Sequence, residues 1–163
     1  MTDPRLKIYV ETTVWSFALT DDAPDFRADT EEFLERCTHG VFRPFISSLV
    51  MDEIRRSESP LREQLERVIS DVRPTLFPVS DQALSLADAF LAAGVVPPRK
   101  PEDAGHVAAA FDMGLDVLVS WNFRHIANVR RAEKFNAVAV LQGYHKELQI
   151  VSPSEVLYAE DDS

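Results

Sequence analysis

The sequence has little cysteine, no long apolar runs and little positive charge. Cys37 is the only cysteine in 163 residues, which excludes a disulfide framework and a thiolate metal cluster. The longest apolar runs, residues 89–96 and 137–141, are much shorter than the roughly 20 residues of a transmembrane helix. The first residues also lack the apolar stretch of a signal peptide. We therefore expect a cytoplasmic protein without a membrane segment.

Positive charge is scarce because 17 lysines and arginines stand against 27 acids, which gives a net charge of −10. This balance argues against a non-specific DNA coat or a polybasic membrane binder. The acids are concentrated in residues 20–36, with a net charge of −5, and in residues 155–163, with a net charge of −4. Residues 120–134 have a net charge of +3, so an enzyme that handles nucleic acid at a local basic patch is not excluded.

The remaining composition, 45% hydrophobic and 9% aromatic, is that of a folded globular protein. Segments typical of strands, at residues 6–10, 43–46, 117–119 and 148–151, alternate with segments typical of helices. Helices are predicted for residues 25–38, 102–113 and 128–141, and others begin near residues 12, 48, 60, 80 and 153. The alternation predicts a single three-layer α/β/α domain over residues 1–158 with a mainly parallel sheet, followed by an acidic tail at 159–163.

Acidic and amide side chains lie near the ends of the predicted strands, where ligands bind in such sheets. Glu11 directly follows the first strand, and Asn122 comes three residues after a later one. Glu53 lies in the helix after the second strand, and Asp103 begins another helix. Asp116 precedes its strand and therefore lies about 10 Å from this edge, so we exclude it from the site.

Three carboxylates at one edge suit a hard cation such as Mg²⁺ or Mn²⁺. Unpaired, the acids Glu11, Glu53 and Asp103 would raise one another's pKa, and a divalent cation relieves this repulsion. It also activates water for attack on a phosphodiester. Each acid has a simpler explanation: Glu11 as a polar turn residue, Glu53 as a solvent-facing one, and Asp103 as an acid favoured by the helix dipole.

Five segments, in order and over essentially the whole chain, resemble the motifs of PIN-domain ribonucleases. They are IYVETTV at 8–14, ISSLVMDEI at 46–54, EDAGHVAAA at 102–110, VLVSWNFRHI at 117–126 and IVSPSEV at 150–156. The resemblance is greatest to the VapC-like toxins of bacterial and archaeal toxin–antitoxin pairs. It implies a PIN-like fold and a Mg²⁺- or Mn²⁺-dependent endoribonuclease, often a homodimer and inhibited by a protein antitoxin.

The resemblance also implies roles for individual residues. Glu11, Glu53 and Asp103 match the metal-binding acids, and Asn122 matches the fourth acidic position of the catalytic site. The chain departs from the family pattern at two positions, because the first and fourth acids are usually aspartates. An amide oxygen can bind a metal or a water but brings no charge. The predicted site therefore has three formal negative charges, which favours a weaker second metal site or one-metal chemistry.

Several neighbouring residues complete the predicted site. Thr12 and Ser120 match the hydroxyl residues that help to hold metal-bound water in the family. His106 lies one turn after Asp103, and we interpret it as a hydrogen-bonded histidine near the core, with a supporting or substrate contact as the alternative. Trp121 is interpreted as an aromatic residue that caps the core, and base stacking is the alternative.

Six basic residues flank the predicted site and are expected to contact RNA phosphates. They are Arg99, Lys100, Arg124, Arg130, Arg131 and Lys134. The leading hypothesis is a metal-dependent endoribonuclease that acts as the toxin of a toxin–antitoxin pair. A PIN-like domain with weakened catalysis that binds protein or RNA is the alternative, supported by Glu11 and Asn122. A phosphatase or a 5′ nuclease acting on DNA is a third hypothesis.

Overall fold

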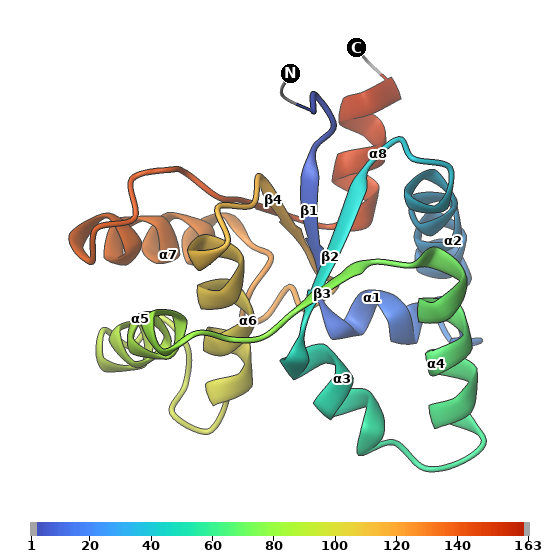
Figure 1. Ribbon diagram of the computed structural model, residues 1–163, viewed down its shortest axis with the longest axis horizontal. Helices are drawn as coiled ribbons and strands as arrows, with labels where there is room; N and C mark the ends of the chain where they lie inside the picture. Colours follow the sequence, from blue (N-terminus) through green and yellow to red (C-terminus); the bar gives the residue numbers. More distant parts are fainter. Residues whose placement is uncertain (1–2, 162–163) are drawn as a thin grey trace.

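The computed structural model describes residues 3–161 and confirms the three-layer α/β/α fold. Its sheet is parallel throughout, with strand order β3-β2-β1-β4-β5. The strands are β1 (Lys7–Val10), β2 (Arg43–Ser47), β3 (Thr75–Phe77), β4 (Val117–Val119) and β5 (Gln149–Val151). Since all the strands run in one direction, their carboxyl ends lie at a single edge, towards the bottom of Figure 1.

Two layers of helices cover the sheet. The helices are α1 (Thr12–Phe17), α2 (Pro24–Thr38), α3 (Ser48–Arg55), α4 (Leu61–Val72), α5 (Asp81–Ala92), α6 (Pro101–Asp112), α7 (Val129–Leu141) and α8 (Pro153–Asp161). In Figure 1, α5, α6 and α7 lie on one side of the sheet and α2, α4 and α8 on the other, while α1 and α3 lie near the carboxyl edge. Helix α8 includes residues 159–161, and residues 162 and 163 of the expected tail lie outside the described residues.

Local signals begin and end the helices that frame the site. The hydroxyl of Ser47 accepts a hydrogen bond from the N–H of Leu49 and caps α3, and Ser80 caps α5 in the same way. Gly94 and Gly114 follow α5 and α6 with φ of +72° and +64°. These left-handed conformations favour glycine, so the predicted helix ends are confirmed.

The sequence patterns did not predict strand β3. Thr75 and Leu76 are exposed and only Phe77 is buried, so the segment shows no buried alternation. It lies at the edge of the sheet and pairs only with β2, where Phe45 is opposite Thr75. A three-residue edge strand of this kind is too short for period-2 patterning to reveal.

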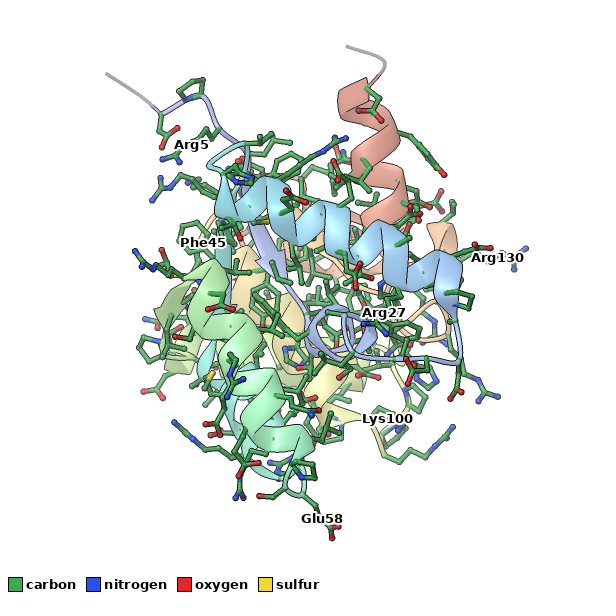
Figure 2. All side chains as sticks on the ribbon, turned by 90° about the vertical axis from the view of Figure 1, so that its right-hand side faces the viewer. Arg5, Arg27, Phe45, Glu58, Lys100 and Arg130 are labelled. Atoms are coloured by element: carbon green, nitrogen blue, oxygen red, sulfur yellow. The ribbon has the colours of Figure 1, made fainter. Side chains whose placement is uncertain are left out.

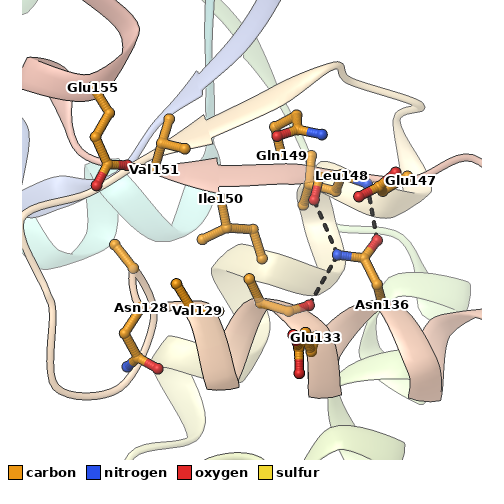
Figure 3. Close-up of a pocket in the computed structure, with 12 residues that line it drawn as sticks. Asn128, Val129, Glu133, Asn136, Glu147, Leu148, Gln149, Ile150, Val151 and Glu155 are labelled. Atoms are coloured by element: carbon orange, nitrogen blue, oxygen red, sulfur yellow. Dashed lines mark hydrogen bonds between the residues drawn. The ribbon is translucent and has the colours of Figure 1, made fainter.

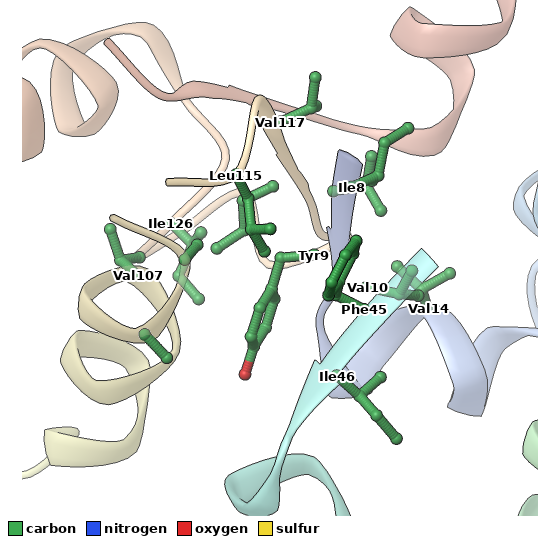
Figure 4. Close-up of a cluster of buried hydrophobic side chains, with 14 of the residues drawn as sticks. Ile8, Tyr9, Val10, Val14, Phe45, Ile46, Val107, Leu115, Val117 and Ile126 are labelled. Carbon is green, nitrogen blue, oxygen red and sulfur yellow. The ribbon is translucent and has the colours of Figure 1, made fainter. Parts of the chain in front are cut away.

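The core is centred on β1, which has a paired strand on each side. Ile8, Tyr9 and Val10 are fully buried, as expected for a strand of a parallel sheet covered on both faces. Figure 4 shows the Tyr9 ring extending from β1 with its hydroxyl at the far end, among aliphatic side chains such as that of Val107. A polar atom this deep in the core needs hydrogen-bond partners, and both of its partners belong to the candidate site.

The exclusion of Asp116 from the site is confirmed, and Cys37 is buried. Asp116 lies at the opposite end of β4 from the carboxyl edge, where it accepts the N–H of Lys7 at 2.8 Å and pairs with Lys146 at 2.8 Å. Cys37 is buried on the inner face of α2, and burial raises the pKa of its thiol to about 12. Within the described residues, no helix combines the length and apolar character needed to cross a bilayer.

Candidate metal centre

Glu11 is held at the carboxyl end of β1 by the strand beside it. Its N–H donates to the carbonyl of Val119 at 3.1 Å, and its side chain is 3% exposed. The Oε1 atom accepts hydrogen bonds from the hydroxyls of Thr13 at 2.5 Å and Ser120 at 2.6 Å. Burial is the main cause that raises the pKa of Glu11, and it outweighs the opposite effects of His106 and the two hydroxyls.

Glu53 and His106 come from helices α3 and α6, which meet beside Glu11. Ligand atoms of Glu11, Glu53 and His106 all lie within 4.8 Å of one another. The ring of His106 is fully buried between two partners: Nε2 bonds Glu53 Oε1, and Nδ1 lies 2.6 Å from the Tyr9 hydroxyl. Tyr9 in turn bonds the Ser47 hydroxyl at 2.7 Å. The interpretation of His106 as a hydrogen-bonded core residue is confirmed, and the same residue also touches the site.

The electrostatics of this group follow from burial and opposite charge. Burial would raise the pKa of Glu53, but its hydrogen bond to His106 and the charge of that ring lower the pKa below its ordinary value. Burial would lower the pKa of His106, but Glu53 and then Glu11 reverse the effect and raise it. The two carboxylates therefore converge on a place where positive charge is stabilised.

Asp103 is not among the residues whose ligand atoms converge within 4.8 Å, but the charge of His106 acts on it. Its Oδ2 atom is 3.4 Å from His125 Nδ1 and is buried without a hydrogen-bond partner among the described residues. Burial raises the pKa of Asp103 more than the charges of His106 and His125 lower it. Asn122 also lies in the turn after β4, and its Oδ1 accepts the N–H of His125 at 3.0 Å. Glu11 and Glu53 thus converge closely, whereas Asp103 lies towards the turn that follows β4.

The hydroxyls at the site differ in part from those expected. Ser120 donates to Glu11 and accepts the N–H of Asn122 at 2.9 Å. Thr13, which sequence reasoning missed, donates to Glu11 and accepts the N–H of Trp121 at 2.9 Å. Thr12 Oγ1 is buried but has no hydrogen-bond partner within the described residues. The signal for Thr13 was its place in the first turn of α1, from which its hydroxyl returns to Glu11.

Trp121 belongs to the core, as interpreted from the sequence. Its ring is 6% exposed, stacks on Phe26 at a centroid distance of 4.3 Å, and donates its indole N–H to the Thr30 hydroxyl at 2.8 Å. This hydrogen bond ties the turn after β4 to helix α2. Trp121 therefore helps to fix the residues on either side of it, Ser120 and Asn122.

The six basic residues predicted to contact RNA are not equivalent. Five are exposed: Arg99, Lys100, Arg124, Arg130 and Lys134. Arg131 is half-buried and donates to the carbonyl of Val95. Burial lowers the pKa of His125, and the charges of Arg131, Arg124 and Arg99 lower it further, which places these three arginines around the turn beside Asp103. Figure 2 shows Arg130 and Lys100 extending from separate parts of the surface.

The chain matches no family model, and it matches no curated protein either. The site is a buried carboxylate–histidine group at the carboxyl edge of a parallel sheet. Its free donor atoms are carboxylate and hydroxyl oxygens, which suit a hard divalent cation, because both ring nitrogens of His106 are already bonded to Glu53 and Tyr9. One buried oxygen at this edge, Asp103 Oδ2, has no hydrogen-bond partner among the described residues, which is consistent with a further ligand there.

Proposed function

We propose that this protein is a divalent-cation-dependent phosphodiester hydrolase whose metal centre is built on Glu11, Glu53 and Asp103. The observation that carries the proposal is the convergence of Glu11 and Glu53 with His106 within 4.8 Å at the carboxyl edge of the sheet. Buried like charges repel one another unless a cation compensates them. A bound Mg²⁺ or Mn²⁺ would supply a polarised water and counter-charge for a phosphate.

The chain's own residues would orient this centre. Thr13 and Ser120 hold the Glu11 carboxylate through two short hydrogen bonds, so its free oxygen keeps a fixed direction. His106, anchored by Tyr9, does the same for Glu53. Hydrogen-bonded supports of this kind orient metal ligands and tune their affinity.

RNA is the substrate that we propose, and the products are a 5′ phosphate and a 3′ hydroxyl. The resemblance to PIN-domain ribonucleases supports this choice, together with the arginines around the turn beside Asp103. We propose that Arg99 and Arg124 contact the phosphate backbone, because their charges act on His125 in this turn. Lys100 acts electrostatically on Asp103, whereas the Arg131 guanidinium is held by the carbonyl of Val95. By the same resemblance we propose that the protein is the toxin of a type II toxin–antitoxin pair. An antitoxin and a homodimer stay predictions.

Cleavage of a single-stranded RNA in Mn²⁺ tests the proposal. We expect metal-dependent cleavage by the wild type and a loss of about 100-fold or more in Asp103→Asn, because the change removes a ligand charge with little change in size. Asp52→Asn is the matched control, since Asp52 lies on α3 next to Glu53 but is exposed, and its one ion-pair partner among the described residues is Arg55. Equal cleavage by wild type and Asp103→Asn would refute the assignment of the site.

Titration calorimetry with Mn²⁺ addresses the number of metals. Asn122 contributes no charge, and its oxygen already accepts the N–H of His125. We therefore expect one tight site, and two tight sites would contradict this expectation.

The second candidate function is a PIN-like domain with weakened catalysis that binds protein or RNA. It is favoured by the pairing of His106 with Glu53, since the ring supplies positive charge where a metal would otherwise be needed. The same titration separates the two candidates. Absence of Mn²⁺ binding, together with RNA binding that persists in EDTA, would favour the binding module.

A further inference from the structure

The outer edge of the sheet at β5 lies in a groove. Among the described strands, β5 pairs only with β4, and the residues beyond its free side line an open cavity of about 640 Å³. Figure 3 shows α7 along one wall, with Val129, Glu133 and Asn136, and Glu155 of α8 beyond Val151. Both faces of β5 contribute lining residues, so the cavity lies over the strand edge itself.

The hydrogen bonds of β5 show which of its backbone groups point outward. The N–H of Gln149 donates to Asp116 O at 3.2 Å, and Val151 O accepts from Ser120 N at 3.0 Å. The backbone groups of Gln149 and Val151 therefore point towards β4. Since backbone direction alternates along a strand, the N–H and C=O of Leu148 and Ile150 point to the free side.

One of these outward pairs already has a partner from a side chain. The amide of Asn136 on α7 takes both groups of Leu148: its Nδ2 donates to Leu148 O at 3.0 Å, and its Oδ1 accepts Leu148 N at 2.9 Å. The dashed lines of Figure 3 mark these bonds. Asn136 thus occupies the position of a further strand at Leu148 only, and an added strand would have to bond the edge beyond it. At Ile150, the next outward position, no described residue bonds the backbone N–H or C=O, and both face the groove.

The groove is negatively charged, which favours a positively charged occupant. Its charged lining residues are Glu133, Glu147 and Glu155, and none of them pairs with a cation among the described residues. Val129, at the rim, is 76% exposed and offers apolar contact. Edge-to-edge pairing with a second copy would bring these acids against their own counterparts in a chain of net charge −10, which is unfavourable.

We propose that β5 accepts an extended basic segment of a partner protein as an added strand. The segment's backbone bonds the N–H and C=O of Ile150, its lysines or arginines face Glu133 and Glu147, and its β-branched side chains pack near Val129. Main-chain bonds supply affinity and alternate side chains supply selectivity in this mode of recognition. The proposal is independent of the metal centre and of any nuclease activity.

Peptide binding tests the proposed strand addition. The fluorescently labelled peptide acetyl-Lys-Thr-Val-Lys-Val-Thr-Lys-amide is titrated with the full chain, and binding is measured by fluorescence anisotropy. Two further peptides are N-methylated at every second residue, in opposite phases. Strand addition predicts that one phase binds like the parent and the other binds about tenfold or more weakly, because only one phase blocks the bonds to β5. Equal binding of the two phases, or no binding of the parent at about 1 mM, would overturn the proposal.

Substitutions of the groove's acids test whether their negative charge attracts the basic peptide. Glu133→Gln combined with Glu147→Gln should weaken parent-peptide binding about threefold to tenfold. Glu58→Gln combined with Glu66→Gln is the matched control, because it removes two exposed acids elsewhere and should leave binding unchanged. Equal weakening by both pairs would show general attraction to an acidic protein and would refute the assignment.

Amide exchange at Ile150 gives an independent measure. Its N–H should exchange fast in the free protein and at least about tenfold more slowly with the parent peptide bound. Protection of this amide without peptide, together with a dimer in sedimentation equilibrium, would assign the edge to a second copy and would overturn the proposal.

Discussion

Removing the Tyr9 hydroxyl should affect stability and metal binding together. This hydroxyl is buried in the core and bonds His106 Nδ1 at 2.6 Å and Ser47 Oγ at 2.7 Å. Tyr9→Phe keeps the ring but leaves His106 Nδ1 without its partner, which costs about 1–3 kcal/mol of unfolding free energy. For a domain of this size, that corresponds to a fall in Tm of about 2–12 °C.

The same change should weaken Mn²⁺ binding, because His106 would lose the contact that orients it against Glu53. Loss of a direct hydrogen-bonded support of a metal ligand reduces affinity about 10–100-fold. Tyr9 acts on Glu53 only through His106, so we expect a loss of about tenfold, at the lower end of this range. Thermal unfolding by circular dichroism in EDTA measures the first effect, and titration calorimetry with Mn²⁺ measures the second. The two readouts are separable, since the stability effect requires no metal.

Tyr144→Phe is the matched control for Tyr9→Phe. The Tyr144 hydroxyl also bonds a residue of α6, Asp112, at 2.9 Å, but Tyr144 is half-buried and Asp112 is at the opposite end of α6 from Asp103. We expect a smaller loss of stability and unchanged Mn²⁺ affinity. If Tyr9→Phe and Tyr144→Phe bind Mn²⁺ equally well, Tyr9 does not position the metal centre, and the reasoning fails.

Two further predictions concern the surroundings of the site. Thr30→Val should lower the unfolding free energy, measured by urea denaturation, by about 1–3 kcal/mol, because it leaves the buried indole N–H of Trp121 unpaired. The control Thr38→Val removes a hydroxyl that bonds the carbonyl of Leu34 in its own helix. Equal losses in the two variants would show that the bond between Thr30 and Trp121 does not stabilise the fold. Burial would raise the pKa of Asp116, but its hydrogen bonds to Lys146 and to the N–H of Lys7 outweigh burial and lower the pKa. The Asp116 carboxylate therefore stabilises the fold above the unfolded-state pKa, and this stabilisation is lost as the pH falls through the folded-state pKa. The stability difference between wild type and Asp116→Asn, measured by urea denaturation from pH 7 to pH 2, should therefore shrink towards acid, and a constant difference would show that the charge is not responsible.

Much of the fold could be predicted because apolar periodicity and helix boundary residues act locally. The run at 117–119 is fully buried, and Gly94 and Gly114 end helices as their left-handed φ requires. β3 was missed because its exposed Thr75 and Leu76 carry no such local signal. Its place depends on pairing with β2, a contact made across about 30 residues of chain.

The candidate site also contains residues that local sequence signals could place and residues that they could not. Glu11 and Ser120 could be placed because each follows a strand of a parallel sheet, and adjacent parallel strands end at the same edge. The hydrogen bond between them is then a consequence of the β1–β4 register, in which Val10 is opposite Val119. Thr13 was missed because its role depends on the direction of the first turn of α1.

The contact between Glu53 and His106 depends instead on how closely α3 approaches α6. Gly105 lies at this crossing, and a Cβ there would be only 2.8 Å from Leu49 Cδ1 of α3. The missing side chain leaves room for the end of the Leu49 side chain between α3 and α6 next to His106. Glycine in a helix interior costs about 1 kcal/mol relative to alanine, a cost that close packing at a site can offset. A single sequence shows that Gly105 is present, but only the packing of the two helices shows that Leu49 fills the space beside it and that a carboxylate there meets a histidine 53 residues away.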